Sequence, residues 1–165
     1  MTNSIILTNK QIIHKIKRIA YQILEVNSSE KEIIIAGITK NGFTFAKKIK
    51  VELNQITDIN ILLCEVLVDK KNPLRPVKTS LHISSYTNKS IVLVDDVLNS
   101  GSTLIYGVKH FLEVPLKRFK TAVLVNRDHK KYPVKADFKG ISLSTTLQDN
   151  ITVDFDTTEA IAYID

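Results

Sequence analysis

Four consecutive aliphatic residues, followed at once by two acids and a small polar loop, constrain this chain most strongly. Residues 91–94 read Ile-Val-Leu-Val, a run that is typical of a strand buried on both faces at the centre of a parallel sheet. Asp95 and Asp96 come next, and from Leu104 the apolar residues recur at the spacing of one helix face. The stretch 91–103 therefore predicts a strand, an acid pair, a polar loop and a helix, in that order.

The loop between the acids and the helix has the composition of a phosphate site. Its residues are small or carry hydroxyl or amide groups: Asn99, Ser100, Gly101, Ser102 and Thr103. At a helix N-terminus, free backbone N–H groups and the positive end of the helix dipole attract anions. The simpler interpretation is a tight turn in which an acid caps the helix. The acid pair, the polar loop and the buried strand occur together, which favours a phosphate-binding site over a simple turn. The two acids suit sugar hydroxyls or the Mg²⁺ that accompanies a phosphorylated ligand.

The composition is that of one compact α/β domain spanning residues 1–165. Hydrophobic residues make up 44% of the chain, which is long enough to bury a sizeable core. No apolar run approaches the ~20 residues of a membrane helix, and no signal peptide is evident, which indicates a cytoplasmic protein. Cys64, the only cysteine, is expected to be a buried core thiol. The net charge of +6 favours polyanionic ligands without separating a nucleotide from RNA.

A second strand, loop and helix precede the first. Residues 32–38 form a strong apolar strand, and a helix with an inward apolar face follows the loop. The loop residues are Thr39, Lys40, Asn41 and Gly42, which again have the order expected for an anion site. Ligands of open parallel sheets bind where the strand order switches, between loops at the carboxyl ends of two strands. We therefore expect the two loops to lie together.

The rest of the pattern supplies flanking elements. Thr8 and Gln11 match a capping box, which predicts a helix to about Val26. Further strands are expected at residues 59–68, 121–125, 151–155 and 160–164, the last two as an edge hairpin without chemistry.

The stretch 91–103 resembles the motif with which type I phosphoribosyltransferases bind phosphoribosyl pyrophosphate (PRPP). That motif is an aliphatic run, two acids, two aliphatics, a variable residue and Thr-Gly-x-Thr; here Ser100 replaces the first threonine and Asn99 is variable. The resemblance implies an open, mainly parallel twisted sheet with helices on both faces. It also implies that Asp95 and Asp96 are catalytic residues that hold the ribose hydroxyls, while residues 99–103 hold the 5-phosphate. Mg²⁺ would be bound mainly through PRPP, with either acid as a candidate ligand, and the protein would form a homodimer or higher homo-oligomer.

Two further segments carry the same resemblance. Thr39, Lys40, Asn41 and Gly42 stand in the position of the family's pyrophosphate loop, where relatives have Lys-Thr-Arg-Gly, so the arginine is absent here. Residues 69–81, hereafter the lid, are basic and contain two prolines, which exclude a helix interior and a central strand. This segment matches the flexible loop that closes over PRPP in the family, although Val68-Asp69-Lys70 replaces the aromatic-Arg pair that often begins that loop.

Residues 126–146, hereafter the hood, begin with Asn-Arg-Asp-His and continue through Pro-Val-Lys-Ala-Asp-Phe-Lys-Gly at residues 133–140 to the hydroxyl-rich Leu-Ser-Thr-Thr at residues 143–146. This order resembles one subfamily, the bifunctional pyrimidine-operon regulators that also act as uracil phosphoribosyltransferases. The resemblance extends over roughly residues 33–155. It implies that Phe138 stacks on the nucleobase. The base edge would be read by Asn126, Arg127 and the backbone near Lys139.

The leading hypothesis is the transfer of ribose 5-phosphate from PRPP to uracil, which forms UMP and releases pyrophosphate. One alternative is a regulator that senses pyrimidine nucleotides and binds an mRNA leader, with weak or no catalysis. Another is a hypoxanthine or guanine phosphoribosyltransferase. Against the purines, Asn99 stands where 6-oxopurine enzymes have an acid and Asn126 where they have a lysine, and an amide cannot act as a general base near neutral pH.

Overall fold

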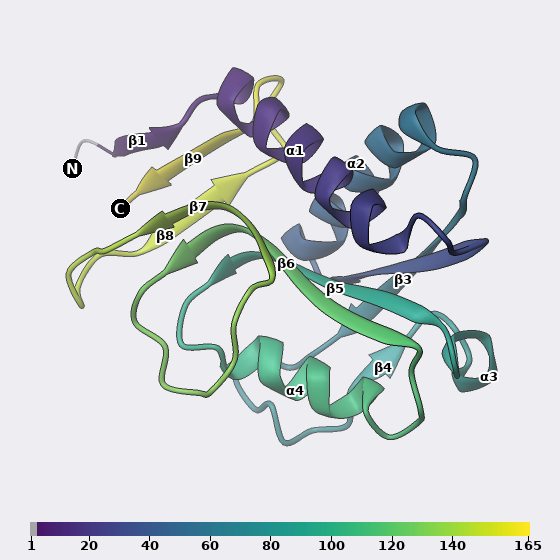
Figure 1. Ribbon diagram of the computed structural model, residues 1–165. Helices are drawn as coiled ribbons and strands as arrows, with labels where there is room; N and C mark the ends of the chain where they lie inside the picture. The colour runs from purple at the N-terminus through teal and green to yellow at the C-terminus, as the bar shows by residue number, and fades with distance from the viewer. Residues whose placement is uncertain (1–2) are drawn as a thin grey trace.

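The computed structural model describes residues 3–165 and is built on a six-stranded sheet (Figure 1). The strands lie in the order β4 (Lys78–Thr79), β3 (Asn60–Leu67), β2 (Glu32–Ile38), β5 (Ser90–Leu98), β6 (Arg118–Arg127) and β7 (Phe138–Leu143). Neighbouring strands from β3 to β7 pair in parallel, whereas β4 is antiparallel to β3. The predicted open, mainly parallel sheet is confirmed.

Helices cover both faces of this sheet (Figure 1). One face carries α1 (Asn9–Asn27) and α2 (Asn41–Ile56), and the other carries α3 (Ile83–Tyr86) and α4 (Ser102–Phe111). The predicted capping box begins α1: the Gln11 N–H donates to Thr8 Oγ1 at 3.4 Å, and the Thr8 N–H donates to Gln11 Oε1 at 2.9 Å. None of the helices within residues 3–165 has the length and apolarity needed to cross a membrane.

The central strands are buried because neither of their faces is polar. Ile33 and Ile35 of β2 pack in the core beneath α1 and α2. Ile34 and Ile38 point to the opposite core, which contains Leu104 of α4. The second core also encloses the fully buried thiol of Cys64, as expected.

The strand order switches between β2 and β5. From β2 the chain passes through α2 to β3 on one side, whereas from β5 it passes through α4 to β6 on the other. The carboxyl ends of β2 and β5 therefore lie side by side, and the loops that follow these two strands leave the same edge of the sheet. In this class of fold, that is the place where ligands bind.

A separate antiparallel sheet forms from the two ends of the described chain: β1 (Ser4–Leu7), β9 (Ile161–Ile164) and β8 (Ile151–Asp154). The predicted hairpin of β8 and β9 is present, but it pairs with β1 instead of extending the main sheet. Strand β1 was not predicted, since a run of three aliphatics is too short to show a period. The small sheet packs on α2 through Phe155, whose ring stacks on Phe45 with centroids 6.2 Å apart.

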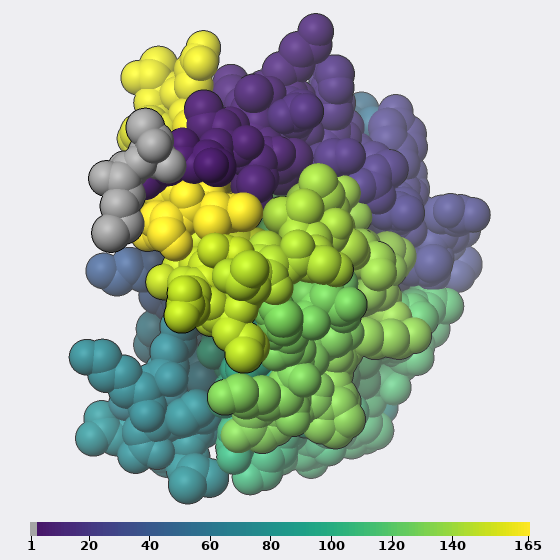
Figure 2. All heavy atoms as spheres, turned by 90° about the vertical axis from the view of Figure 1, so that its left-hand side faces the viewer, coloured from purple at the N-terminus to yellow at the C-terminus, as the bar shows by residue number. Residues whose placement is uncertain are grey.

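The lid and the hood stand at the carboxyl edge of the main sheet. In Figure 2, which faces this edge, the lid (teal) and the hood (light green) lie on either side of a recess. The lid contains only the two-residue edge strand β4, which agrees with the exclusion of a central strand. The hood begins with the last residues of β6 and includes β7.

Candidate functional site

Asp95 and Asp96 lie near the end of β5, inside the strand rather than after it. The strand continues to Leu98 and α4 begins at Ser102, so the predicted ends of both elements are corrected by a few residues. Both acids are buried, with 4% and 9% of their surfaces exposed. The backbone N–H of Asp96 donates to Asp95 Oδ1 at 2.9 Å, which ties the first carboxylate to the strand.

The environment of Asp95 disfavours its ionised form. Burial raises the pKa of this carboxyl well above its ordinary value, and the adjacent Asp96 raises it further. Lys70 acts in the opposite direction, as a nearby positive charge. A buried carboxylate of this kind is suited to a site where positive charge is brought in by a ligand or develops during a reaction.

The residues predicted to bind phosphate surround a cavity of about 100 Å³. Asn99, Ser100, Gly101, Ser102 and Thr103 all line the cavity. Gly101 is the N-cap of α4 and has a φ of 86°, in the left-handed region that favours glycine. The N–H of Ser102 donates to Ser100 Oγ at 3.2 Å. The next N–H groups of the first turn, those of Thr103 and Leu104, have no partner within the helix and are available to an anion.

The second predicted loop lies against the acid pair. The side-chain amide of Asn41 donates to Asp96 Oδ2 at 3.1 Å. Gly42 is so close to Asp95 that a Cβ atom at position 42 would lie 2.9 Å from Oδ1 of the acid. Thr39 bonds to β3, through Glu65 Oε1 at 3.2 Å, and the peptide bond between Thr39 and Lys40 is cis. The structure thus brings together the two loops that the sequence analysis expected to meet.

Two of the predicted base-binding residues, Asn126 and Arg127, lie at the carboxyl end of β6 and form hydrogen bonds to later residues of the hood. Asn126 is 7% exposed, and its amide donates to Ser142 Oγ at 3.2 Å, while its Oδ1 is buried without a hydrogen-bond partner in the described part of the chain. The Arg127 guanidinium donates to Thr145 Oγ1 and to the Thr146 carbonyl, each at 2.6 Å. Arg127 therefore holds the hydroxyl-rich turn, and its donors at Nε and one terminal nitrogen are already in use.

Phe138 and Lys139 begin β7, whereas Asn126 and Arg127 end the neighbouring strand β6 and lie beside the other end of β7. In the strand register Phe138 pairs with Ala122, whereas Asn126 pairs with Ser142, which is four residues or roughly 13 Å further along the strand. The Phe138 ring is 8% exposed and packs in the core beneath α1, and the Lys139 carbonyl accepts a hydrogen bond from Arg18. The four residues expected to surround one base are thus split into two pairs.

Lys70 is a site residue that the sequence analysis did not identify. It belongs to the lid, yet it lines the same cavity as Asp95 and the phosphate loop. The basic composition of the lid was visible in the sequence, but nothing in the spacing distinguished Lys70 from its neighbour Lys71. The hood also reaches this loop, because the N–H groups of Lys131 and Tyr132 donate to the Ser100 carbonyl at 2.8 and 3.1 Å.

The donor set of the acid pair fits Mg²⁺. Asp95 and Asp96 supply carboxylate oxygens, which Mg²⁺ prefers, and Asp95 lines the cavity of the phosphate loop. Within residues 3–165, no group of three or more His, Cys, Asp or Glu side chains gathers as a complete metal cage. Mg²⁺ often binds through one or two carboxylates together with substrate phosphates and water, so the pair suits an ion that arrives with a diphosphate.

Comparison with known proteins gives similarity over nearly the whole chain. Residues 2–159 match the phosphoribosyl transferase domain family. The bifunctional protein PyrR of Macrococcus caseolyticus is 31% identical over 163 residues, which cover 94% of each chain. The bifunctional protein PyrR of Fusobacterium nucleatum is 32% identical over 158 residues, which cover 90% of this chain and 89% of that protein.

Solved structures show the same fold at lower sequence identity. A hypoxanthine phosphoribosyltransferase from Trypanosoma cruzi, in complex with the product IMP, superposes with a TM-score of 0.77 at 18% identity, covering 96% of this chain and 92% of that one. A hypoxanthine-guanine phosphoribosyltransferase from Bacillus anthracis superposes with a TM-score of 0.73 at 21% identity, covering 86% and 82% of the two chains. At these identities the similarity concerns the fold alone.

Proposed function

This chain belongs to the phosphoribosyltransferase family, and from that membership we propose that it transfers the phosphoribosyl group of PRPP to uracil, forming UMP and pyrophosphate. The observation that carries the proposal is that the acid pair lies between two loops: Asp95 lines the cavity formed by residues 99–103, while Asn41 and Gly42 lie against the two acids. The buried acid pair, the phosphate loop at the start of α4, and the loop at the start of α2 meet where the strand order switches. Such an arrangement can hold a sugar between two phosphate groups.

The reaction requires positioning and electrostatic support more than a nucleophile. As the bond from the anomeric carbon to pyrophosphate breaks, positive charge builds on the ribose, and carboxylates nearby stabilise it. We assign this role to Asp95 and Asp96, which would also hold the ribose hydroxyls. Residues 99–103 would bind the 5-phosphate, and residues 39–42 the leaving pyrophosphate. Mg²⁺ bound with the diphosphate would neutralise part of the leaving group's negative charge.

Uracil is proposed over the purines because of two amide side chains. Asn99 lines the cavity where a purine enzyme of this family has an acid, and Asn126 replaces the lysine that would bond a 6-oxo group. Neither amide can exchange a proton as a general base near neutral pH. The curated relatives, which carry the name PyrR, support the same choice. The fold similarity to hypoxanthine enzymes does not bear on the base.

The test is PRPP-dependent nucleotide formation measured with uracil, hypoxanthine and guanine in parallel. We expect UMP to form in the presence of Mg²⁺ and the double variant Asp95→Asn, Asp96→Asn to lose nearly all turnover while it stays folded. Efficient formation of IMP or GMP with uracil unreactive would overturn the choice of base. Unchanged turnover in the double variant would overturn the assignment of the acids.

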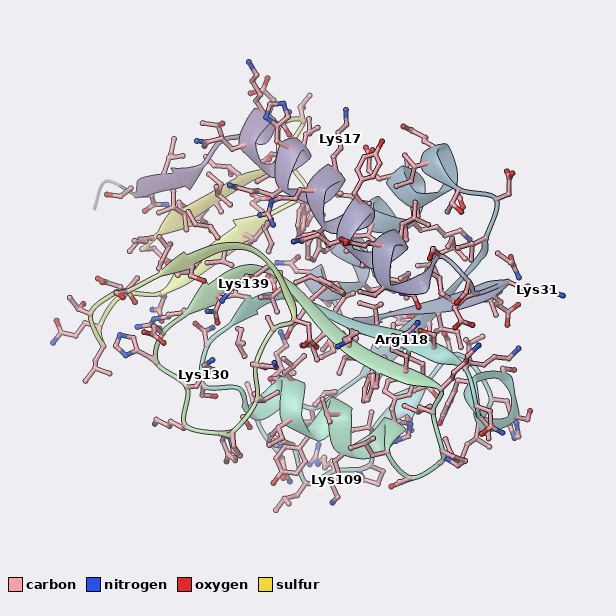
Figure 3. All side chains as sticks on the ribbon, viewed as in Figure 1. Lys17, Lys31, Lys109, Arg118, Lys130 and Lys139 are labelled. Atoms are coloured by element: carbon pink, nitrogen blue, oxygen red, sulfur yellow. The ribbon has the colours of Figure 1, made fainter. Side chains whose placement is uncertain are left out.

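A second candidate is a regulator that binds RNA and senses pyrimidine nucleotides. Exposed basic side chains are spread over the view of Figure 3, among them Lys17 of α1, Lys109 of α4 and Lys130 of the hood. Together with the net charge of +6, they favour contact with phosphates.

Filter binding with a pyrimidine-operon leader RNA tests this candidate. Affinity should fall steeply as salt rises, and UMP should change it, because two ligands of one regulator are thermodynamically linked. Binding that is weak, independent of RNA sequence and unaffected by UMP would exclude the regulator and leave only the proposed enzyme activity.

A further inference from the structure

The side chain of Asn41 joins the acid pair to the small C-terminal sheet. Its Nδ2 donates to Asp96 Oδ2 at 3.1 Å and to the backbone carbonyl of Val153 in β8 at 2.8 Å. The two acceptors belong to residues 55 and 112 positions away in the sequence. A side-chain amide has two N–H protons, so both donors of Asn41 are satisfied within the protein.

These contacts leave the Asn41 side chain without a donor for a diphosphate. Its remaining polar atom, Oδ1, is an acceptor and would repel an anion. The backbone N–H groups at the start of α2 are different, because the first turn of a helix leaves them without intrahelical partners. The loop can therefore bind pyrophosphate through its backbone while the side chain has another task.

That task is visible in the position of Asp96. The carboxylate is 9% exposed and adjacent to the buried Asp95, so it needs a partner that fixes its orientation. An amide donor does so without neutralising the negative charge, which an arginine or lysine would do. The acceptor on the other side is also firmly held, since Val153 is 2% exposed and Phe155, two residues further on, stacks on Phe45 of α2.

We propose that Asn41 is a positioning residue, which anchors the Asp96 carboxylate to the C-terminal sheet and does not bind the diphosphate through its side chain. The inference rests on the proposed function for its catalytic consequence. Through the bond from Asn41 to Val153, the small C-terminal sheet supports the site. The sequence pattern of residues 151–164 had indicated only an edge hairpin without chemistry.

Kinetics of Asn41→Ala and Asn41→Asp separate this role from direct binding. We expect kcat to fall by roughly 10- to 100-fold in Asn41→Ala, the scale found when a catalytic group is misplaced, with pyrophosphate affinity by calorimetry unchanged. Asn41→Asp should fall further, because it replaces a donor by a second negative charge beside Asp96. Asn54→Ala is the matched control, since Asn54 is exposed near the other end of α2. A loss of pyrophosphate affinity with kcat retained would overturn the proposal.

A nuclear magnetic resonance measurement tests the contact without any turnover. The side-chain N–H signals of Asn41 should be protected from exchange with water in the wild-type protein and should shift in Asp96→Asn, while those of Asn54 do neither. If the Asn41 side-chain N–H groups exchange freely with water and their chemical shifts do not change in Asp96→Asn, the inference is overturned even in an active enzyme. Conversely, a wild-type protein that forms no nucleotide with any base would overturn the proposed function. The Asn41–Asp96 contact would then still be tested by the magnetic resonance measurement.

Discussion

Gly42 lies directly against Asp95: a methyl group at position 42 would fall 2.9 Å from the carboxylate Oδ1 and 2.9 Å from the carbonyl of Val94. A contact this short with backbone atoms cannot be relieved by rotating a side chain. The absence of a side chain at Gly42 is therefore what allows the start of α2 to approach the end of β5.

We expect Gly42→Ala to abolish most phosphoribosyl transfer and to lower the melting temperature, because β5 and α2 must separate. Gly107→Ala in α4 is the control, since its added methyl would meet the movable side chain of Leu93 at 3.0 Å and alanine favours the helix by about 1 kcal/mol. Steady-state kinetics and thermal denaturation of the two variants provide the check. Equal activity in both would show that the close approach has no role in the site.

The buried Asp95 should make the protein less stable as the pH rises. Its pKa in the folded state lies well above the ordinary value of 3.8, so above pH 3.8 the folded state binds more protons than the unfolded state. The free energy of unfolding then falls with rising pH across that window. We expect Asp95→Asn to be more stable than the wild type at pH 7, with the difference shrinking towards pH 4.

Urea denaturation at several pH values measures this difference. The asparagine keeps an acceptor for the N–H of Asp96, so the substitution removes the charge and preserves that bond. A variant that is less stable than the wild type at pH 7 would contradict the prediction.

Lys70 should contribute to PRPP binding from the lid. It lines the cavity with Asp95 and the phosphate loop, where a positive charge attracts the 5-phosphate and offsets the buried acid. We expect Lys70→Ala to raise the KM for PRPP about 10-fold, a modest effect for an exposed lysine, and to weaken the dependence of KM on salt. Lys71→Ala, which alters the adjacent exposed lysine outside the cavity lining, should behave like the wild type.

Gly101 combines a left-handed backbone with a tight contact. Its φ is 86°, and a Cβ atom would lie 2.6 Å from Cγ1 of Val134 in the hood. The conformation alone costs an L-residue roughly 1–2 kcal/mol, so Gly101→Ala should reduce both stability and 5-phosphate affinity. The double variant Gly101→Ala, Val134→Ala should recover the part caused by the clash, as a double-mutant cycle of unfolding free energies would show. No recovery would mean that the backbone strain accounts for the whole effect.

Local pattern was sufficient for the framework of this protein. The uninterrupted aliphatic runs of β2 and β5 predicted buried parallel strands, because only strands covered on both faces lack a polar side. The capping box of Thr8 and Gln11 predicted the start of α1, because both of its bonds form within one turn. The acid pair and the small polar loop were found together for the same reason, since they are contiguous in the chain and their order carries the information.

Only the tertiary structure decided which side chains share a neighbourhood. Asn41 meets Val153 across 112 residues, Lys70 reaches the phosphate loop from the lid, and Phe138 is buried away from Asn126. None of these relations has a sequence period, because they depend on how the switch in strand order and the small antiparallel sheet bring distant segments to one edge. Hydrogen bonds of a polar side chain are set by the acceptors within about 3 Å of it, and those acceptors are assembled only when the chain folds.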